Sequence, residues 1–228
     1  MRNLVKCIVI VLIIVSINSV VNGKHFINYV NNIDSTSKKL AIIPFVKENS
    51  DAVIINKDTY RIYPDSDNNN YGVVSLTMVP RNIWISFKTY INVDSDSDCV
   101  ILFTDRLYSS ITTNANKYGL AIWLGDETES KQHLVSVAYN KDGYPYSCGD
   151  IAFYCNNNTY IHRNKEVSIM VYFGDRIIVY MNNQKVVDTT NPTTYNKFYF
   201  YILMNTDGGN GYFDVYDIRM RLNSIIVI

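Results

Sequence analysis

The side chains best suited to chemistry in this sequence are aromatic rings that lie near carboxylates and amides. Trp123 and Asp126 close one apolar run, Tyr144 follows in a polar stretch, and Asn205 and Asp207 open a glycine-rich segment. An aromatic face can pack on the C–H surface of a sugar, while carboxylate and amide groups bind its hydroxyls. These five residues are the expected ligand-binding residues, although aromatic residues are also common on sheet faces that bind nothing.

Carboxylates that could form a catalytic pair are not suitably spaced. Asp126, Glu127 and Glu129 cluster at the end of an apolar run, where a solvated acidic turn is the simpler interpretation. Hydrolysis of a glycosidic bond needs one protonated carboxylate and a partner that attacks or activates water. A methyltransferase would need a nucleotide-type glycine loop after a strand, and the sequence has none. We therefore expect no enzymatic activity.

A turn of alternating Asp and Ser supplies the best candidate metal ligands. Asp94, Asp96 and Asp98 offer the hard oxygen atoms that calcium prefers, but no glycine stands at the sixth position that an EF-hand requires. A plain hairpin turn is the simpler interpretation, and calcium binding at these residues stays open. Neither a CxxC pair nor a histidine spacing supports zinc, so we expect no cofactor.

The elements that must position these residues are strands. In the segments 82–93 and 166–173 apolar residues alternate with polar ones, which is the period of a strand with one buried face. The residues expected in the core are Ile85, Phe87, Ile91, Val167, Ile169, Val171 and Phe173. Trp84 and Lys88 should then lie on the opposite face.

The segment 166–220 is the part around which the chain is organised, because strands and turns follow one another there directly. Turns are expected at Gly174 and Asp175 and at Asn182 and Asn183, since Gly and Asn adopt the backbone conformations that tight hairpins require. The expected strands are 167–173, 176–182, 184–188, 198–204 and 212–220. We predict that they form a continuous β-meander.

The first half of the chain has the same character. We expect a short strand at 40–46 that is broken at Pro44, and a hairpin at 51–63. Further strands are expected at 72–78, 99–103, 118–124, 134–139 and 151–154. Many short strands without a convincing helix predict an all-β fold, an antiparallel two-sheet sandwich, as a single domain over 24–228.

Composition fits a globular protein of 228 residues, of which 47% are hydrophobic and 18% charged. The 21 basic and 21 acidic residues give a net charge of zero, so no basic stripe indicates nucleic acid or an anionic membrane surface.

Four segments resemble the strand pairs of a known superfamily. They read WISFKTYINVDSDSDCVILFTD, YGLAIWLGDE, VSIMVYFGDRIIVYMNNQKVVDTTNP and FYFYILMNTDGGNGYFDVYDIRM. The last two resemble the closing half of a concanavalin A-like (legume-lectin or laminin G-like) jelly roll, and the first two are similar to strand pairs of that superfamily and also to farnesoic acid O-methyltransferase-like domains. The resemblance covers roughly the residues 72–220. The resemblance implies a jelly-roll sandwich. The chain lacks the ExDxxE motif of the superfamily's glycosidases and the calcium and manganese signature of its legume lectins.

We expect the loop 205–211 and the turn at Asp126 to converge at one edge of the sandwich. Loops at a sandwich end can vary while the strands hold them in place. Gly208 and Gly209 remove side chains where a ligand would approach, and Asp207 offers an acceptor for hydroxyls. The alternative is an ordinary glycine-rich turn between the last two strands.

The amino terminus resembles a signal peptide. Arg2 and Lys6 precede an apolar run, and Val21 and Gly23 are small residues at positions that signal peptidase prefers, so residues 1–23 should be removed. An uncleaved anchor is the alternative, but the run is shorter than the roughly 20 residues that a membrane span needs.

Secretion allows disulfides and glycosylation. We expect a disulfide between Cys148 and Cys155, with Cys99 unpaired and buried. The alternative is that Cys99 is available to a second chain. Asn157 with Thr159 forms an N-glycosylation sequence, which also occurs by chance.

These observations predict a secreted, non-catalytic module that binds a glycan or glycoprotein, without membrane insertion after signal cleavage. The alternative is a secreted protein-binding or structural protein that uses a Tyr-rich sheet face, and a glycoside hydrolase is a distant third.

Overall fold

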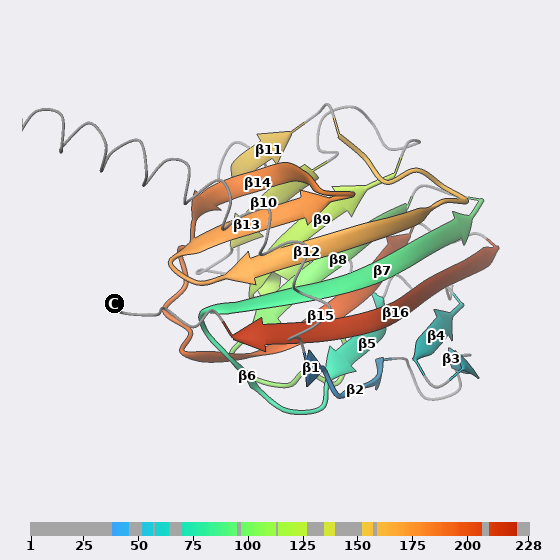
Figure 1. Cartoon of the computed structure of the whole chain (residues 1–228), viewed down its shortest axis with the longest axis horizontal. Coiled ribbons are helices and arrows are strands. Elements are labelled where there is room, and N and C mark those ends of the chain that lie inside the picture. The colour runs from blue at the N-terminus through green and yellow to red at the C-terminus, as the bar shows by residue number, and fades with distance from the viewer. Residues whose placement is uncertain are drawn as a thin grey trace, which may run out of the picture. The chain divides into compact units, whose positions relative to one another are not determined.

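The protein is described by a computed structural model that covers residues 38–45, 52–56, 58–63, 70–94, 97–112, 114–126, 135–139, 152–156, 159–206 and 210–222. Regular structure in these residues is β-strand apart from one short 3-10 turn, η1 (Ala115–Lys117). The strands form two antiparallel sheets, as Figure 1 shows, so the predicted all-β sandwich is confirmed. No helix among the described residues is both long and apolar enough to cross a membrane.

Sheet A follows the order β14-β13-β12-β7-β16-β4-β3, and β1 also pairs with β16. Its strands are β14 (Gln184–Thr190), β13 (Arg176–Met181), β12 (Glu166–Phe173), β7 (Ile83–Val93), β16 (Gly211–Leu222), β4 (Thr59–Ile62), β3 (Ala52–Asn56) and β1 (Lys38–Lys39). The long strands β7 and β16 lie side by side in its middle (Figure 1).

Sheet B follows the order β11-β10-β9-β8-β15-β5-β2, and β6 also pairs with β15. Its strands are β11 (Ala152–Asn156), β10 (Val135–Tyr139), β9 (Leu120–Gly125), β8 (Ser97–Thr104), β15 (Lys197–Thr206), β5 (Tyr71–Ser75), β2 (Ile42–Phe45) and β6 (Val79–Pro80).

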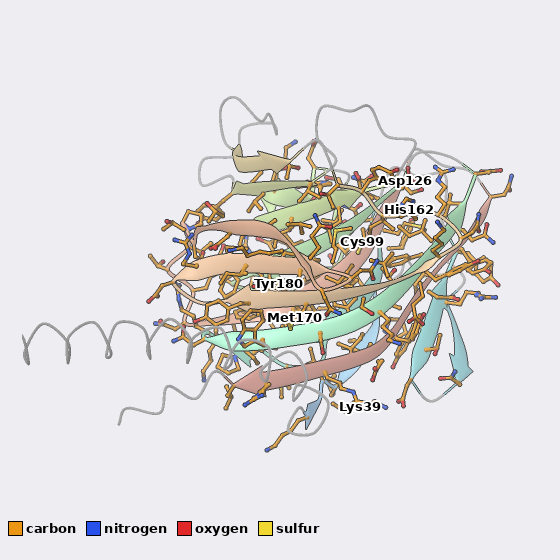
Figure 2. All side chains as sticks on the ribbon, turned by 45° about the horizontal axis from the view of Figure 1, so that its top comes forward. Lys39, Cys99, Asp126, His162, Met170 and Tyr180 are labelled. Carbon is orange, nitrogen blue, oxygen red and sulfur yellow. The ribbon has the colours of Figure 1, made fainter. Side chains whose placement is uncertain are left out.

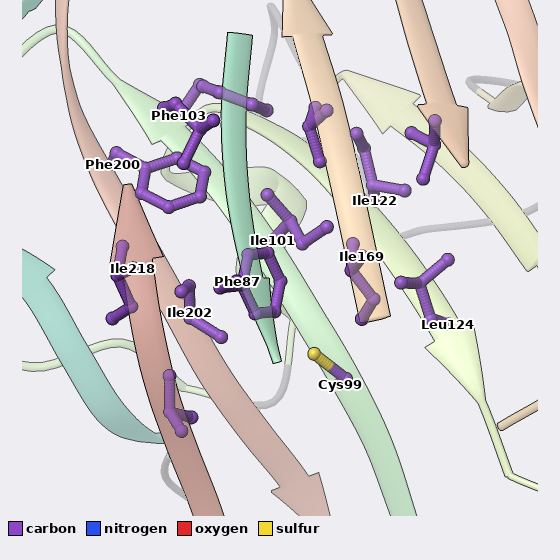
Figure 3. Close-up of a cluster of buried hydrophobic side chains, with 14 of the residues drawn as sticks. Phe87, Cys99, Ile101, Phe103, Ile122, Leu124, Ile169, Phe200, Ile202 and Ile218 are labelled. Atoms are coloured by element: carbon purple, nitrogen blue, oxygen red, sulfur yellow. The ribbon is translucent and has the colours of Figure 1, made fainter. Parts of the chain in front are cut away.

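The main core lies between the sheets and contains the predicted inward face. Its members include all the residues expected there: Ile85, Phe87, Ile91, Val167, Ile169, Val171 and Phe173. Phe103 of sheet B stacks on Phe173 of sheet A with ring centroids 4.2 Å apart. Figure 3 shows how side chains from both sheets fill this layer. Trp84 lies outside the cluster, so the predicted register of β7 is confirmed.

A second apolar cluster lies on the outer face of sheet B. It consists of Val74, Val100, Leu102, Ile111, Ala115, Ala121, Trp123, Ala138, Tyr201 and Leu203. The segment 105–119, which the structure describes except for residue 113, contains η1, and η1 packs on β8, β9 and β10. The segment contributes Ile111 and Ala115 to the cluster. The strands β5, β8, β9 and β10 of sheet B are therefore buried on both faces along most of their length, whereas sheet A has no such second layer among the described residues.

The predicted meander is only partly right. β12, β13 and β14 are joined by hairpins, and Asn182 and Asn183 have the positive φ angles expected of the tight turn, 48° and 66°. β15 instead belongs to sheet B, and β16 returns to sheet A beside β7. Asn191 helps to turn the chain away from β14, because its side chain donates to the Gly174 carbonyl and accepts from the Thr193 N–H.

The expected break at Pro44 is wrong. Pro44 lies inside β2 and pairs with Val73 of β5. β2 has no neighbour on its other side in the described chain, and an edge strand can accommodate a residue that lacks an N–H.

Candidate functional site

Two of the predicted ligand-binding residues, Asn205 and Asp126, lie at the same end of sheet B. Asn205 on β15 pairs with Asp98 on β8, and Asp98 pairs with Gly125 on β9. Asp126 follows Gly125 directly and donates its N–H to the Ser97 carbonyl at 3.1 Å. Neighbouring strand ends therefore bring an amide and two carboxylates to one edge of the sheet.

Asn205 and Trp123 lie on the outer face of this sheet. Along β15, Ile202 and Met204 enter the main core, whereas Leu203 enters the outer cluster, so Asn205 must also face outward. Trp123 belongs to the outer cluster and is only 7% exposed. Its ring therefore packs mainly against protein. Asn205 and Asp98 are half-buried residues, and Oδ1 of Asp98 is buried without a hydrogen-bond partner in the described chain.

Asp126 is held in a buried ion pair. Asp126 is fully buried, and Arg163 Nε donates to Oδ2 of Asp126 at 2.7 Å. The Ile161 N–H donates to the Gly125 carbonyl at 2.8 Å, which joins the segment before β12 to the end of β9. Asp126 and the neighbouring His162 lie at this end of the molecule (Figure 2). The geometry gives Asp126 a structural contact, and its ligand-binding role stays a prediction.

Arg163 was not singled out from the sequence. A basic residue just before a strand has no spacing relation to Asp126, so only the fold brings the two together.

A clamp between Asp94 and Asn210 joins β7 to β16 at this end. The Asn210 N–H donates to Asp94 Oδ1 at 2.7 Å, and the Asp94 N–H donates to the Asn210 carbonyl at 3.0 Å. Asp96 lies outside the described residues, and β8 already begins at Ser97, so the Asp94 to Asp98 turn is shorter than expected. Among the described residues no three His, Cys, Asp or Glu side chains are grouped to hold a metal ion.

Two buried amide side chains beside the outer cluster were also not predicted from the sequence. Asn70 precedes β5, and its Nδ2 donates to the Thr112 carbonyl at 2.7 Å, while its Oδ1 has no hydrogen-bond partner in the described chain. Asn116 in η1 is fully buried, and neither atom of its amide has such a partner there. Buried polar groups of this kind mark places where ordered water or another small group can be accommodated.

Cys99 is buried in the main core beside Phe87, Ile101 and Ile169, as Figure 3 shows. It is a free thiol, as predicted, and burial raises its pKa far above the ordinary range, so the thiolate form is suppressed.

The remaining predicted site residues are not described by the structure. Tyr144, Cys148, Asn157 and Asp207 lie outside the described residues, as does the side chain of Cys155 in β11. The disulfide, the glycosylation site and the ligand role of Tyr144 and Asp207 stay predictions.

A cavity of about 270 Å³ lies elsewhere, between β1, β2, β4 and β16. Leu40, Ile42, Tyr60 and Ile218 form its apolar wall, and Lys39 and Asp58 lie at its polar side. None of the predicted ligand-binding residues lines it.

Comparison with known proteins gives matches in structure only. No family model matches the sequence, and no curated protein matches it. The carbohydrate recognition domain of Emp47p superposes with a TM-score of 0.55 at 12% identity, covering 82% of this chain and 96% of that domain. The carbohydrate-binding module CBM66 from Bacillus subtilis gives a TM-score of 0.51 at 11% identity, covering 81% of this chain and 97% of that module.

Two further structures extend the comparison. The exoplasmic/lumenal domain of VIP36, in a form bound to Ca2+ and Man3GlcNAc, gives a TM-score of 0.53 at 15% identity over 78% of this chain and 81% of that one. A sialidase gives a TM-score of 0.53 at 10% identity, but over only 19% of its own length. At these identities the likeness shows the fold alone.

Proposed function

Because the chain has the concanavalin A-like lectin-type fold, we propose that it is a secreted module that binds a glycan and catalyses no reaction on it. The observation that carries the proposal is the pairing of Asn205 with Asp98 on the outer face of sheet B, next to the end of β9. Structural neighbours named as carbohydrate recognition domains or carbohydrate-binding modules support it.

The chemistry of this edge suits a sugar. An amide can donate to and accept from hydroxyl groups, and a neighbouring carboxylate accepts from two of them. Asn205 and Asp98 place these groups on adjacent strands, and Trp123 lies on the next strand along the same face. The predicted contribution of Asp207 would extend the edge from the loop that follows β15.

A glycan array with paired variants tests the site. Asn205→Ala should weaken binding about three- to tenfold, which corresponds to one neutral hydrogen bond. Asn196→Ala is the matched control, because this exposed residue precedes the opposite end of β15. Equal affinity of both variants and the unmodified protein would refute the site, whereas the absence of saturable, sugar-competed binding on the array would refute the function.

Asp207→Ala tests the predicted loop contact separately. A hydrogen bond to a charged group contributes about 1.5 to 3 kcal/mol, so the variant should keep its fold and lose at least about tenfold in affinity. Unchanged binding by a correctly folded variant would remove Asp207 from the site.

Secretion rests on the residues 1–23 and is tested at the amino terminus. Expression in a secreting host should release a protein whose first residue is Lys24. Retention of Met1 in a membrane fraction would favour the uncleaved anchor.

A protein partner on the outer face of sheet A is the second candidate. Tyr90 and Tyr212 stack there with ring centroids 6.0 Å apart, and the Arg61 guanidinium lies 3.6 Å from the Tyr212 ring centroid. Such aromatic and Arg groups are enriched at protein interfaces. Binding to cells that survives enzymatic removal of glycans, and that Tyr90→Ser abolishes, would favour this function over glycan binding.

A further inference from the structure

Asn210 is an exposed residue directly before β16, and we propose that it is a site of spontaneous deamidation that opens the Asp94 clamp. Deamidation requires an Asn side chain that the backbone nitrogen of the next residue can reach, which is easiest when that residue has no side chain. Asn210–Gly211 is the one such pair in the expected mature chain, because Asn22–Gly23 falls within the expected signal peptide.

The fold requires glycine at position 211. Its φ of 134° lies in a region that L side chains rarely adopt, and a Cβ atom there would lie 1.9 Å from the Asn92 carbonyl oxygen. A bulkier residue, which would slow the reaction by crowding the nitrogen, cannot be accommodated without moving β7. The reactive dipeptide is therefore a consequence of the close approach between β7 and β16.

The strand pairing also leaves the attacking nitrogen available. The Asp94 N–H bonds to the Asn210 carbonyl one residue beyond the ladder of β7 and β16, so this bond stands where the ladder would have a hydrogen-bonded pair. The next pair, Val93 and Gly211, must then be a non-hydrogen-bonded pair, in which N–H groups point away from the partner strand. The pairing of β4 with β16 starts only at Phe213. In the described chain, neither neighbouring strand pairs with the Gly211 nitrogen.

The reaction needs no partner beyond water. The Gly211 nitrogen loses its proton to solvent base and attacks Cγ of Asn210, the Cγ–Nδ2 bond breaks, and ammonia leaves with a proton from solvent. Water then opens the succinimide at either carbonyl, giving Asp or isoAsp at position 210. Because the nitrogen must be deprotonated, the rate should rise with pH.

Asp or isoAsp at position 210 would weaken the contacts that Asp94 now makes with Asn210. Asn210 Nδ2 now lies 3.4 Å from Asp94 Oδ2, and its backbone N–H lies 2.7 Å from Oδ1. Deamidation replaces the amide with a carboxylate that faces another carboxylate, and like charges placed opposite each other on adjacent strands repel. The isoAsp product also lengthens the backbone at the first residue before β16, so the clamp should open.

Peptide mapping of the purified protein after prolonged incubation at mildly alkaline pH tests the proposal. Asn210 should convert to a mixture of Asp and isoAsp, and the conversion should be lost in Asn210→Gln. Asn183, an exposed residue with positive φ that is followed by Gln184, is the internal control and should stay intact. Asp94→Ala should accelerate the reaction, because it frees the amide.

Hydrogen exchange measures whether deamidation opens the clamp between Asp94 and Asn210. In the aged protein, and in Asn210→Asp, protection of the Asp94 amide should fall by about two- to tenfold, as expected for loss of one hydrogen bond. A synthetic peptide of residues 206–214 provides the unfolded reference. The site is refuted if the peptide converts while Asn210 in the folded protein does not, and the effect on the clamp is refuted if protection is unchanged.

Discussion

The outer faces of the two sheets are built in different ways. On sheet A, charged and aromatic side chains face outward as pairs, such as Lys88 with Glu166 at 2.8 Å and Arg61 with Asp214 at 2.7 Å. On sheet B the outer face is apolar and is covered by the segment 105–119. The outer face of sheet A thus carries paired polar side chains, and sheet B lies between two apolar layers.

The difference follows from the strand sequences. β7 alternates apolar and polar residues, whereas β9 reads LAIWLG and is buried along its whole length. A strand with one buried face alternates, and a strand buried on both faces reads as a continuous apolar run. The second layer covers the apolar part of the sheet B face, and the polar residues Asn205 and Asp98 lie near the strand ends beside it.

The largest expected contrast is between the ion pair buried at the end of β9 and an exposed ion pair on the outer face of sheet A. Arg163→Met leaves the buried Asp126 carboxylate without its ion pair, so we expect a loss of about 3 to 5 kcal/mol in the free energy of unfolding. Lys88→Met removes an exposed pair and should cost at most about 1 kcal/mol. Chemical denaturation measures both, and equal losses would contradict the contrast.

Large-to-small substitutions on the outer faces should give the next largest contrast. Leu203→Ala truncates a fully buried side chain of the outer cluster, and we expect a cost of about 2 to 5 kcal/mol. Ile178→Ala on the outer face of sheet A truncates a half-buried side chain and should cost less than about 1 kcal/mol. If Leu203→Ala is as mild as its control, the segment 105–119 does not cover sheet B in solution.

A single hydroxyl group tests how the covering segment is attached. The Tyr108 N–H donates to the Tyr201 hydroxyl at 3.0 Å, so Tyr201→Phe should destabilise the protein by about 0.5 to 1.5 kcal/mol. Tyr199→Phe on the same strand is the control and should have a smaller effect. Amide exchange at Tyr108 should rise in the first variant only, and protection that does not change would show that this hydrogen bond does not help to attach the segment.

The smallest expected effect is a pH dependence on sheet A. Hydrogen bonds from Lys88 and Tyr216 lower the pKa of Glu166 below its ordinary value of 4.5. The stabilisation is therefore complete above pH 4.5 and is lost as the pH falls through the lower pKa of the folded state. Because Glu166 is half exposed, the contribution is screened and should be about 0.2 to 1 kcal/mol. Glu166→Gln should flatten this part of the stability curve, and an unchanged curve would contradict the assignment.

Much of the fold followed from local pattern. The alternation in β7 and β12 predicted their inward faces, and the Asn182 and Asn183 turn was placed correctly, because side-chain period and left-handed turn geometry are properties of a few neighbouring residues. Cys99 was predicted to be unpaired because the expected pairing of Cys148 with Cys155 left it as the odd cysteine, and the structure shows it as a buried free thiol.

The sheet to which each strand belongs did not follow from the sequence. β14, β15 and β16 are consecutive and similar in pattern, yet β15 crosses to sheet B and β16 pairs with β7. Strand pairing depends on contacts between residues far apart in the chain, and the alternation of one strand does not specify its neighbour.

The sequence by itself determined the inward faces of β7 and β12 and the turn at Asn182 and Asn183, and the groups that could contact a sugar stay a prediction from it. The tertiary structure decided that Asn205 meets Asp98, that Asp126 is held by Arg163, and that Asn210 meets Asp94. These are contacts between strand ends and loops that come from separate parts of the chain. They form only when two sheets close over a common core, which no local pattern encodes.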